Sequence, residues 1–202
     1  MLETRQLHPT LAREVVGLTL WQTLDDATVA ELRDLYAQFG VLVFRRQALS
    51  EAELAAFCAV FGPLERTVRS DWASPGTPEV TVLSNLQDGL GRPIGGLGDG
   101  ELQWHSDQSY MLHPATGAAL YALELPTEGG ETSRVAYNPK HRWHYFSEMQ
   151  TDEVLLIRVH DSANDGRARL SFHTSFENPL TPGAPPRESI EVRTLVFFPP
   201  AA

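Results

Sequence analysis

Two residues of one short segment could bind a metal ion together. In the run Trp104-His105-Ser106-Asp107, an imidazole and a carboxylate stand two positions apart. In an extended chain, side chains at positions i and i+2 point to the same face, so His105 and Asp107 would converge on one point. A second histidine from a distant strand would complete a set of two histidines and one carboxylate. That facial arrangement holds Fe(II) and leaves positions open for oxygen and a co-substrate.

The third ligand must be chosen from the remaining histidines by their spacing. The sequence contains His8, His105, His113, His141, His144, His160 and His173. His173 follows the run 168–172, whose short, partly apolar pattern is typical of a strand. We therefore predict that His173 completes the metal site.

Two further segments carry groups that suit a carboxylate. Arg187 and Ser189 open the last predicted strand two positions apart, which places a guanidinium and a hydroxyl on one face. Two consecutive glycines before Thr132 allow a tight turn that would bring its hydroxyl toward the same cavity. Arg193 would share the face of Arg187 but lie roughly 20 Å from it at about 3.3 Å per residue. Arg193 is therefore the alternative to Arg187.

Two helices are predicted before these segments. Apolar residues recur at helical spacing over residues 25–39, and Asp25 or Asp26 can cap the start of that helix. A Ser-x-x-Glu capping box begins at Ser50 and predicts a second helix over about residues 51–61.

The rest of the chain has the pattern of short strands separated by Gly, Pro, Asn and Asp. The expected strands are residues 41–44, 79–84, 117–125, 153–160, 167–172 and 189–198. Their spacing favours an antiparallel sandwich or barrel over a parallel α/β sheet. The glycine-rich residues 95–100 lack the Gly-Lys-Ser/Thr ending of a phosphate loop and are interpreted as a flexible loop. We expect a single domain over residues 1–202, with a helical buttress at about 25–61 and a β core at about 79–198.

Composition excludes several classes of protein. A hydrophobic content of 42% and 21% charged residues are typical of a globular domain with a core. With 26 acidic against 16 basic residues, the net charge of −10 argues against a nucleic-acid partner. The single cysteine, Cys58, excludes an intrachain disulfide framework and fits a reducing compartment. No stretch approaches the roughly 18–20 apolar residues of a membrane span, so we expect a cytoplasmic protein without a membrane partner.

Residues 15–133 resemble the taurine and 2,4-dichlorophenoxyacetate dioxygenase family. The matching segments are Glu14-Val15-Val16-Gly17-Leu18, Phe39-Gly40-Val41-Leu42-Val43-Phe44-Arg45, Phe61-Gly62-Pro63-Leu64, Trp104-His105-Ser106-Asp107-Gln108-Ser109-Tyr110 and Pro126-Thr127-Glu128-Gly129-Gly130-Glu131-Thr132. Members of this family are Fe(II)- and 2-oxoglutarate-dependent oxygenases built on a double-stranded β-helix, a cupin-like jelly roll. The resemblance implies that His105 and Asp107 bind iron and that Thr132, 27 residues after His105, contacts 2-oxoglutarate.

From Tyr137 onward the chain resembles hydroxylases related to the cephamycin-pathway methoxylation proteins. The matching segments are Asn138-Pro139-Lys140-His141-Arg142-Trp143, Asp152-Glu153-Val154-Leu155-Leu156-Ile157 and Pro186-Arg187-Glu188-Ser189-Ile190-Glu191-Val192-Arg193. This match supports a metal ligand at His173 and leaves the choice between Arg187 and Arg193 open. The first family normally has a long insertion before its second histidine, whereas Asp107 and His173 are only 66 residues apart.

These features favour a mainly β protein that uses Fe(II), 2-oxoglutarate and O2 to oxidise, most simply to hydroxylate, a small organic acid or natural product. Arg187 would pair with the far carboxylate of 2-oxoglutarate, with a hydrogen bond from Ser189 or Thr132, because an unpaired carboxylate is costly in a dry pocket. The expected walls of the substrate pocket are Asn85, Trp104 and Tyr110.

Two other functions remain open. A shortened, non-catalytic β-barrel homologue would account for the short spacing after Asp107. A cupin-like metalloenzyme that does not use 2-oxoglutarate would need a fourth protein ligand such as His141, His144 or His160. The sequence leaves open whether the protein forms a homo-oligomer.

Overall fold

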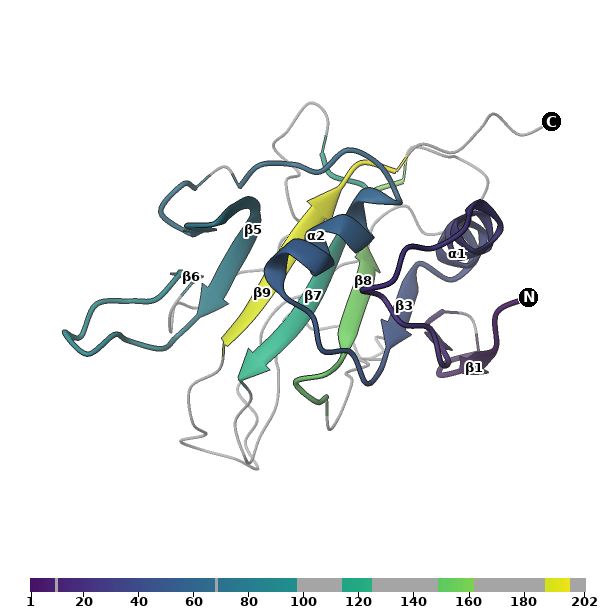
Figure 1. The fold of residues 1–202 in the computed structure, drawn as a ribbon, viewed down its shortest axis with the longest axis horizontal. Coiled ribbons are helices and arrows are strands. Elements are labelled where there is room, and N and C mark those ends of the chain that lie inside the picture. Colours follow the sequence, from purple (N-terminus) through teal and green to yellow (C-terminus); the bar gives the residue numbers. More distant parts are fainter. Residues whose placement is uncertain (10, 68, 98–113, 125–148, 162–187, 197–202) are drawn as a thin grey trace, which may run out of the picture.

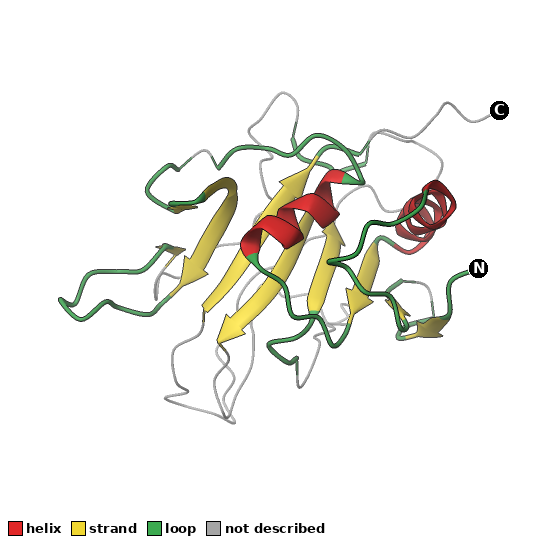
Figure 2. Cartoon of the chain, viewed as in Figure 1, coloured by secondary structure: helices red, strands yellow, loops and turns green. Residues whose placement is uncertain are grey.

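The computed structural model describes residues 1–9, 11–67, 69–97, 114–124, 149–161 and 188–196 of the chain. These residues form one large sheet and two helices, as Figure 1 and Figure 2 show. The helices are α1 (Asp26–Phe39) and α2 (Glu51–Ala59). The strands are β1 (Thr4–Gln6), β2 (Arg13–Val15), β3 (Val41–Phe44), β4 (Ala73–Ser74), β5 (Thr77–Ser84), β6 (Gly96–Leu97), β7 (Gly117–Glu124), β8 (Val154–Arg158) and β9 (Glu188–Thr194).

The strands are ordered β1-β2-β3-β8-β7-β9-β5-β4 across the sheet, and β6 pairs with β5. The central strands are antiparallel to one another, as the sequence predicted. Two pairs, β2 with β3 and β5 with β6, are parallel and were not predicted. The late strand β8 lies between β3 and β7, so segments more than 100 residues apart in the chain are hydrogen-bonded neighbours (Figure 1).

Both predicted helices are confirmed, and their ends are capped as expected. The Asp25 carboxylate accepts a hydrogen bond from the Thr28 N–H at 2.7 Å. Gly40 ends α1 with φ of 70°, a left-handed conformation that glycine adopts without strain. At α2, the Ser50 hydroxyl accepts from the Glu53 N–H while the Glu53 carboxylate accepts from the Ser50 N–H, which completes the capping box.

Helix α2 covers one face of the sheet and closes the main core (Figure 1). Leu54, Phe57 and Cys58 of α2 are buried there, with Ile190 and Val192 of β9 in the same cluster. Cys58 is thus the small buried hydrophobe that the sequence predicted, and burial raises the pKa of its thiol. Burying each large apolar side chain of this cluster contributes about 1.5–3 kcal/mol relative to exposure.

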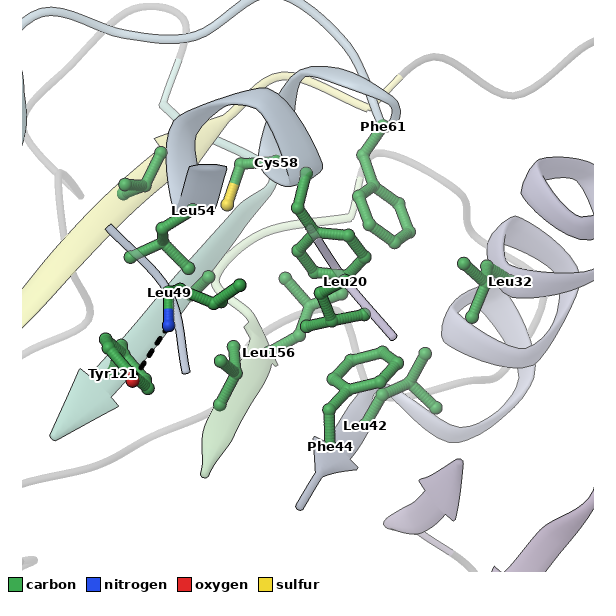
Figure 3. Close-up of a cluster of buried hydrophobic side chains, with 14 of the residues drawn as sticks. Leu20, Leu32, Leu42, Phe44, Leu49, Leu54, Cys58, Phe61, Tyr121 and Leu156 are labelled. Atoms are coloured by element: carbon green, nitrogen blue, oxygen red, sulfur yellow. Dashed lines mark hydrogen bonds between the residues drawn. The ribbon is translucent and has the colours of Figure 1, made fainter. Parts of the chain in front are cut away.

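The core also holds the loop between β3 and α2 in place. The buried Tyr121 hydroxyl of β7 accepts a hydrogen bond from the Leu49 N–H at 3.2 Å and donates to the Gln47 carbonyl at 3.1 Å (Figure 3). The ring of Phe44 on β3 meets that of Phe57 on α2 edge-to-face, with centroids 5.2 Å apart. Helix, loop and sheet therefore pack as one unit.

Some expectations need correction or remain outside the described residues. Gly96 and Leu97, expected in a flexible loop, form β6 because the backbone there finds hydrogen-bond partners on β5. The predicted strand 167–172 and the glycine-rich residues 98–100 lie outside the described part of the chain. Of the helices that the structure describes, none is both long and apolar enough to cross a bilayer.

Candidate functional site

The predicted metal ligands His105, Asp107 and His173 all lie outside the described residues. The same holds for the other predicted contacts Trp104, Tyr110, Thr132 and Arg187. Within the described ranges, no three His, Cys, Asp or Glu side chains gather closely enough to hold a metal ion. The described residues thus offer no competing metal centre, and the predicted ligand set stays a prediction.

Two strands of the described sheet border these segments. β6 ends at Leu97, eight residues before His105. β9 begins at Glu188, directly after Arg187. The site that the sequence predicts would therefore be attached to adjoining parts of one sheet, because β5 pairs with both β6 and β9.

β9 presents polar side chains on the face of the sheet opposite α2. Ile190 and Val192 belong to the core under the helix, so the alternation of a strand turns Ser189, Glu191 and Arg193 to the other face. Ser189 is buried there, and its hydroxyl donates to the Leu83 carbonyl of β5 at 3.4 Å. The predicted co-substrate contact Ser189 is therefore held against the neighbouring strand.

Glu191 and Arg193 form an ion pair on that face. Arg193 Nε lies 2.9 Å from Glu191 Oε1, and Arg193 Nη2 lies 3.1 Å from Glu191 Oε2. The Glu191 side chain is 3% exposed and that of Arg193 is 25% exposed. The pair is bidentate, the strongest form of the arginine–carboxylate contact. Sequence reasoning weighed Arg193 but missed Glu191, although polar residues at alternate positions of β9 were a visible signal.

The side chains on this face differ in polarity from one strand to the next. Thr81 of β5 lies opposite Glu191, and its hydroxyl is 2.7 Å from that of Thr67. On the other side of β9, Leu120 of β7 lies opposite Glu191, and Leu155 of β8 follows in the same row. The face is thus polar along β9, mixed along β5, where Leu83 lies opposite Ser189, and apolar over β7 and β8.

The segment around Gly62 anchors the end of β9. The Thr194 hydroxyl donates to the Gly62 carbonyl at 3.2 Å, and the Leu195 N–H donates to the Pro63 carbonyl at 3.0 Å. The Glu65 N–H donates to the Arg193 carbonyl, also at 3.0 Å. These bonds fix the backbone of the strand that carries the polar face.

Two other predicted residues can be placed. Asn85 directly follows β5 and is half-buried, so its side chain stands at the end of a strand of the same sheet. His160, an alternative metal ligand, follows β8, and its N–H donates to the Thr116 carbonyl at 3.3 Å. Near it, the buried Arg158 pairs with Asp161 at 3.3 Å and donates to the carbonyls that end α1. The Arg158–Asp161 pair therefore stabilises the fold, because Arg158 also binds the carbonyls at the end of α1.

Comparison with known proteins gives relatives for the sequence. The chain is 50% identical over 68 residues to hydroxylase/desaturase efuI of Hormonema carpetanum, which covers 34% of this chain and 23% of that protein. It is 31% identical over 167 residues to pentalenolactone F synthase of Streptomyces avermitilis, covering 81% and 51%. It is 34% identical over 150 residues to an alpha-ketoglutarate-dependent 2,4-dichlorophenoxyacetate dioxygenase of Cupriavidus pinatubonensis, covering 65% and 50%. The chain thus spans about half the length, or less, of these curated relatives.

A solved structure shows the fold. The crystal structure of a taurine dioxygenase from Burkholderia xenovorans superposes with a TM-score of 0.66 at 15% identity, covering 96% of this chain and 89% of that one. The predicted mainly β, cupin-like jelly-roll fold is therefore confirmed.

Family models match both parts of the chain. One, described as an oxidoreductase/YMDC permease-like domain, matches residues 112–197. Another, for the taurine catabolism dioxygenase TauD, TfdA family, matches residues 3–137, which is more than half of the chain. The resemblance of residues 15–133 to this family is thereby confirmed, and this chain belongs to the TauD/TfdA dioxygenase family.

Proposed function

We propose that this chain is an Fe(II)- and 2-oxoglutarate-dependent dioxygenase that hydroxylates or otherwise oxidises a small organic acid or natural product. The observation that carries the proposal is the family match over residues 3–137, which includes His105, Asp107 and Thr132. Relatives whose names state an alpha-ketoglutarate-dependent dioxygenase activity support it. The proposal includes a cytoplasmic location.

In the proposed site, His105, Asp107 and His173 hold Fe(II), and two imidazoles with one carboxylate are donors that suit this ion. When bound, the iron supplies oxidation of a substrate C–H bond by O2, with 2-oxoglutarate converted to succinate and carbon dioxide. Each ligating imidazole is expected to give its second N–H to an acceptor, which orients the ring.

The other proposed contacts bind and orient 2-oxoglutarate. Arg187 pairs with the far carboxylate, because leaving that charge unpaired away from water costs several kcal/mol. Ser189 and Thr132 add hydrogen bonds. Ser189 is buried beside β5, where its hydroxyl donates to the Leu83 carbonyl. Because the hydroxyl has a single proton, it must turn away from that carbonyl to donate to a carboxylate of 2-oxoglutarate.

The substrate is proposed to be a small molecule that carries both apolar and polar groups. The apolar row of Leu120 and Leu155 beside the polar strand β9 supports such a mixed substrate. Names among the relatives include dioxygenases of 2,4-dichlorophenoxyacetate and phenoxypropionate and a pentalenolactone F synthase. Asn85, Trp104 and Tyr110 are proposed to contribute to the pocket.

The proposal is tested by anaerobic titration of the metal-free protein with Fe(II) and then 2-oxoglutarate. We expect stoichiometric Fe(II) binding, followed by a visible charge-transfer absorption when 2-oxoglutarate binds the same centre. Metal binding without that absorption would favour the cupin-like alternative. Failure to bind either would favour the non-catalytic homologue.

A further inference from the structure

A single arginine connects the two-stranded ribbon at one edge of the sheet to a central strand. β1 and β2 form this antiparallel ribbon, and β2 joins β3 through three parallel residue pairs (Figure 1). Glu14 of the ribbon is buried, and so is Glu153, which directly precedes β8. Arg45, which directly follows β3, contacts both carboxylates. Arg45 therefore stands between two buried acids that come from the two neighbours of β3.

The pairing of the strands brings these three side chains together. Glu14 lies opposite Val43 of β3, and Arg45 follows Val43 by two residues. Arg45 Nε lies 3.5 Å from Glu14 Oε2. Its Nη1 donates a hydrogen bond to Glu153 Oε1. Two nitrogens of one guanidinium thus serve two carboxylates.

The two acids are more deeply buried than the cations that neutralise them. The side chains of Glu14 and Glu153 are 7% and 5% exposed, whereas that of Arg45 is 34% exposed. A second cation, Arg5, places Nη1 3.2 Å from Glu14 Oε2, but its side chain is 66% exposed, so water screens its charge. Without the charge of Arg45, two buried carboxylates would repel each other where little water screens them.

The ribbon is the element that can relieve such a repulsion by moving. β1 is the outermost strand on its side of the sheet, and Arg5 and Gln6 on it are exposed. Moving Glu14 into water breaks the three residue pairs that join β2 to β3. By contrast, β8 is hydrogen-bonded on both sides, to β3 and to β7, so moving it would disrupt the centre of the sheet. Local opening follows the weaker attachment.

We propose that Arg45 is an electrostatic lock that keeps the β1–β2 ribbon on the sheet by neutralising Glu14 and Glu153 together. When the lock is lost, the ribbon leaves the edge of β3 because the two carboxylates repel each other. The loss of one attraction is the smaller effect. This inference concerns the stability of the sheet edge and is independent of the proposed dioxygenase function.

Four full-length proteins test this inference: wild type, Arg45→Gln, Glu14→Gln and the double variant Arg45→Gln/Glu14→Gln. Hydrogen–deuterium exchange measured by mass spectrometry compares the ribbon, residues 4–15, with the central strands β7 and β9. Arg45→Gln should speed exchange in the ribbon at least about tenfold and leave β7 and β9 within about twofold of wild type.

The other two variants distinguish repulsion from lost attraction. Glu14→Gln leaves Arg45 paired with Glu153, so exchange in the ribbon should stay within about threefold of wild type. In the double variant, Glu153 has no like charge beside it and faces amide groups that can donate hydrogen bonds to it. Its ribbon should therefore also exchange within about threefold of wild type, more slowly than that of Arg45→Gln.

A matched control is available in Arg92, which pairs with Asp88 in the loop between β5 and β6. Arg92→Gln also removes an arginine–carboxylate pair and should leave exchange in the ribbon unchanged. Thermal unfolding of each variant, monitored by circular dichroism, shows whether it is folded. If Arg45→Gln alone does not fold, the double variant decides: a folded double variant supports the lock, and an equally unfolded one overturns it.

Three other results would overturn the inference. Unchanged exchange in Arg45→Gln would show that the ribbon does not depend on this arginine. A double variant whose ribbon exchanges as fast as that of Arg45→Gln would show that repulsion between the two carboxylates is not the cause. Faster exchange in β7 and β9 to the same extent as in the ribbon would show that Arg45 stabilises the whole sheet rather than its edge.

Discussion

The backbone of Gly62 lies directly against the carbonyl of Leu195. A Cβ atom built on Gly62 would stand 1.6 Å from the Leu195 oxygen, far inside van der Waals contact. Gly62 lies within the range matched by the dioxygenase family model, and Leu195 immediately follows β9. The glycine is therefore required by the close approach of two backbones that hold the end of the strand carrying Glu191 and Arg193.

Gly62→Ala should destabilise the protein by about 2–4 kcal/mol, because the backbone must move to relieve the clash. The free energy of unfolding is measured by urea denaturation. Gly89→Ala is the matched control, since a Cβ there meets nothing within 4 Å, and it should change stability by less than about 0.5 kcal/mol. Equal effects of the two substitutions would contradict this account of Gly62.

His105→Ala and Asp107→Ala should each abolish Fe(II) binding at micromolar metal, because two remaining ligands hold a labile divalent ion weakly. Metal content after desalting measures this directly. Stoichiometric iron in either variant would exclude the assignment.

The third ligand has its own test, because His173 lies in the less closely matched part of the chain. His173→Ala should lose Fe(II), whereas His160→Ala should retain it, since His160 follows β8 near the buried pair Arg158–Asp161. The reverse result would move the third ligand to His160.

Arg187→Leu should weaken 2-oxoglutarate binding by roughly 2–3 kcal/mol, or about 30- to 150-fold, by removing a charge-assisted bidentate contact. Fe(II) should remain bound, because Arg187 is not among the predicted ligands. Parallel titrations of metal and co-substrate check both points. A variant that binds 2-oxoglutarate as wild type does would assign the far carboxylate to another residue.

The capping box of α2 should make stability depend on pH. Hydrogen bonds from the Ser50 N–H and hydroxyl hold the pKa of Glu53 below its ordinary value of 4.5. A carboxyl whose folded pKa is lowered stabilises the fold fully above the unfolded pKa and loses that contribution as pH falls through the folded pKa. The effect should therefore appear in the range below about pH 4.5.

Glu53→Gln keeps an acceptor for the cap but removes its titration. The melting temperature of wild type should fall more steeply than that of Glu53→Gln as pH is lowered through this range. Thermal unfolding by circular dichroism at several pH values measures the difference. Parallel curves for the two proteins would show that the cap does not contribute.

Features encoded by neighbouring residues were predicted well. The N-cap of α1 at Asp25 or Asp26, the end of α1 at Gly40 and the capping box at Ser50 were predicted from local patterns, since a cap involves residues only a few positions apart. The structure selects Asp25 as the N-cap. The strands β3, β5, β7, β8 and β9 were predicted from short apolar runs, with ends shifted by a few residues. The His-x-Asp pair at positions 105 and 107 was likewise visible as a local spacing.

The sequence by itself determined the helices and the central strands, because those signals lie within a few consecutive residues. The ligand set stays a prediction. Only the tertiary structure decided that β8 lies between β3 and β7, that Gly96 and Leu97 form a strand, and that Gly62 meets Leu195. The physical reason is that a strand obtains its hydrogen bonds, and a close contact its partner, from residues distant in the chain. The bidentate geometry of Glu191 and Arg193 was decided in the same way, because strand pairing on both sides buries β9 and turns both charges to one face.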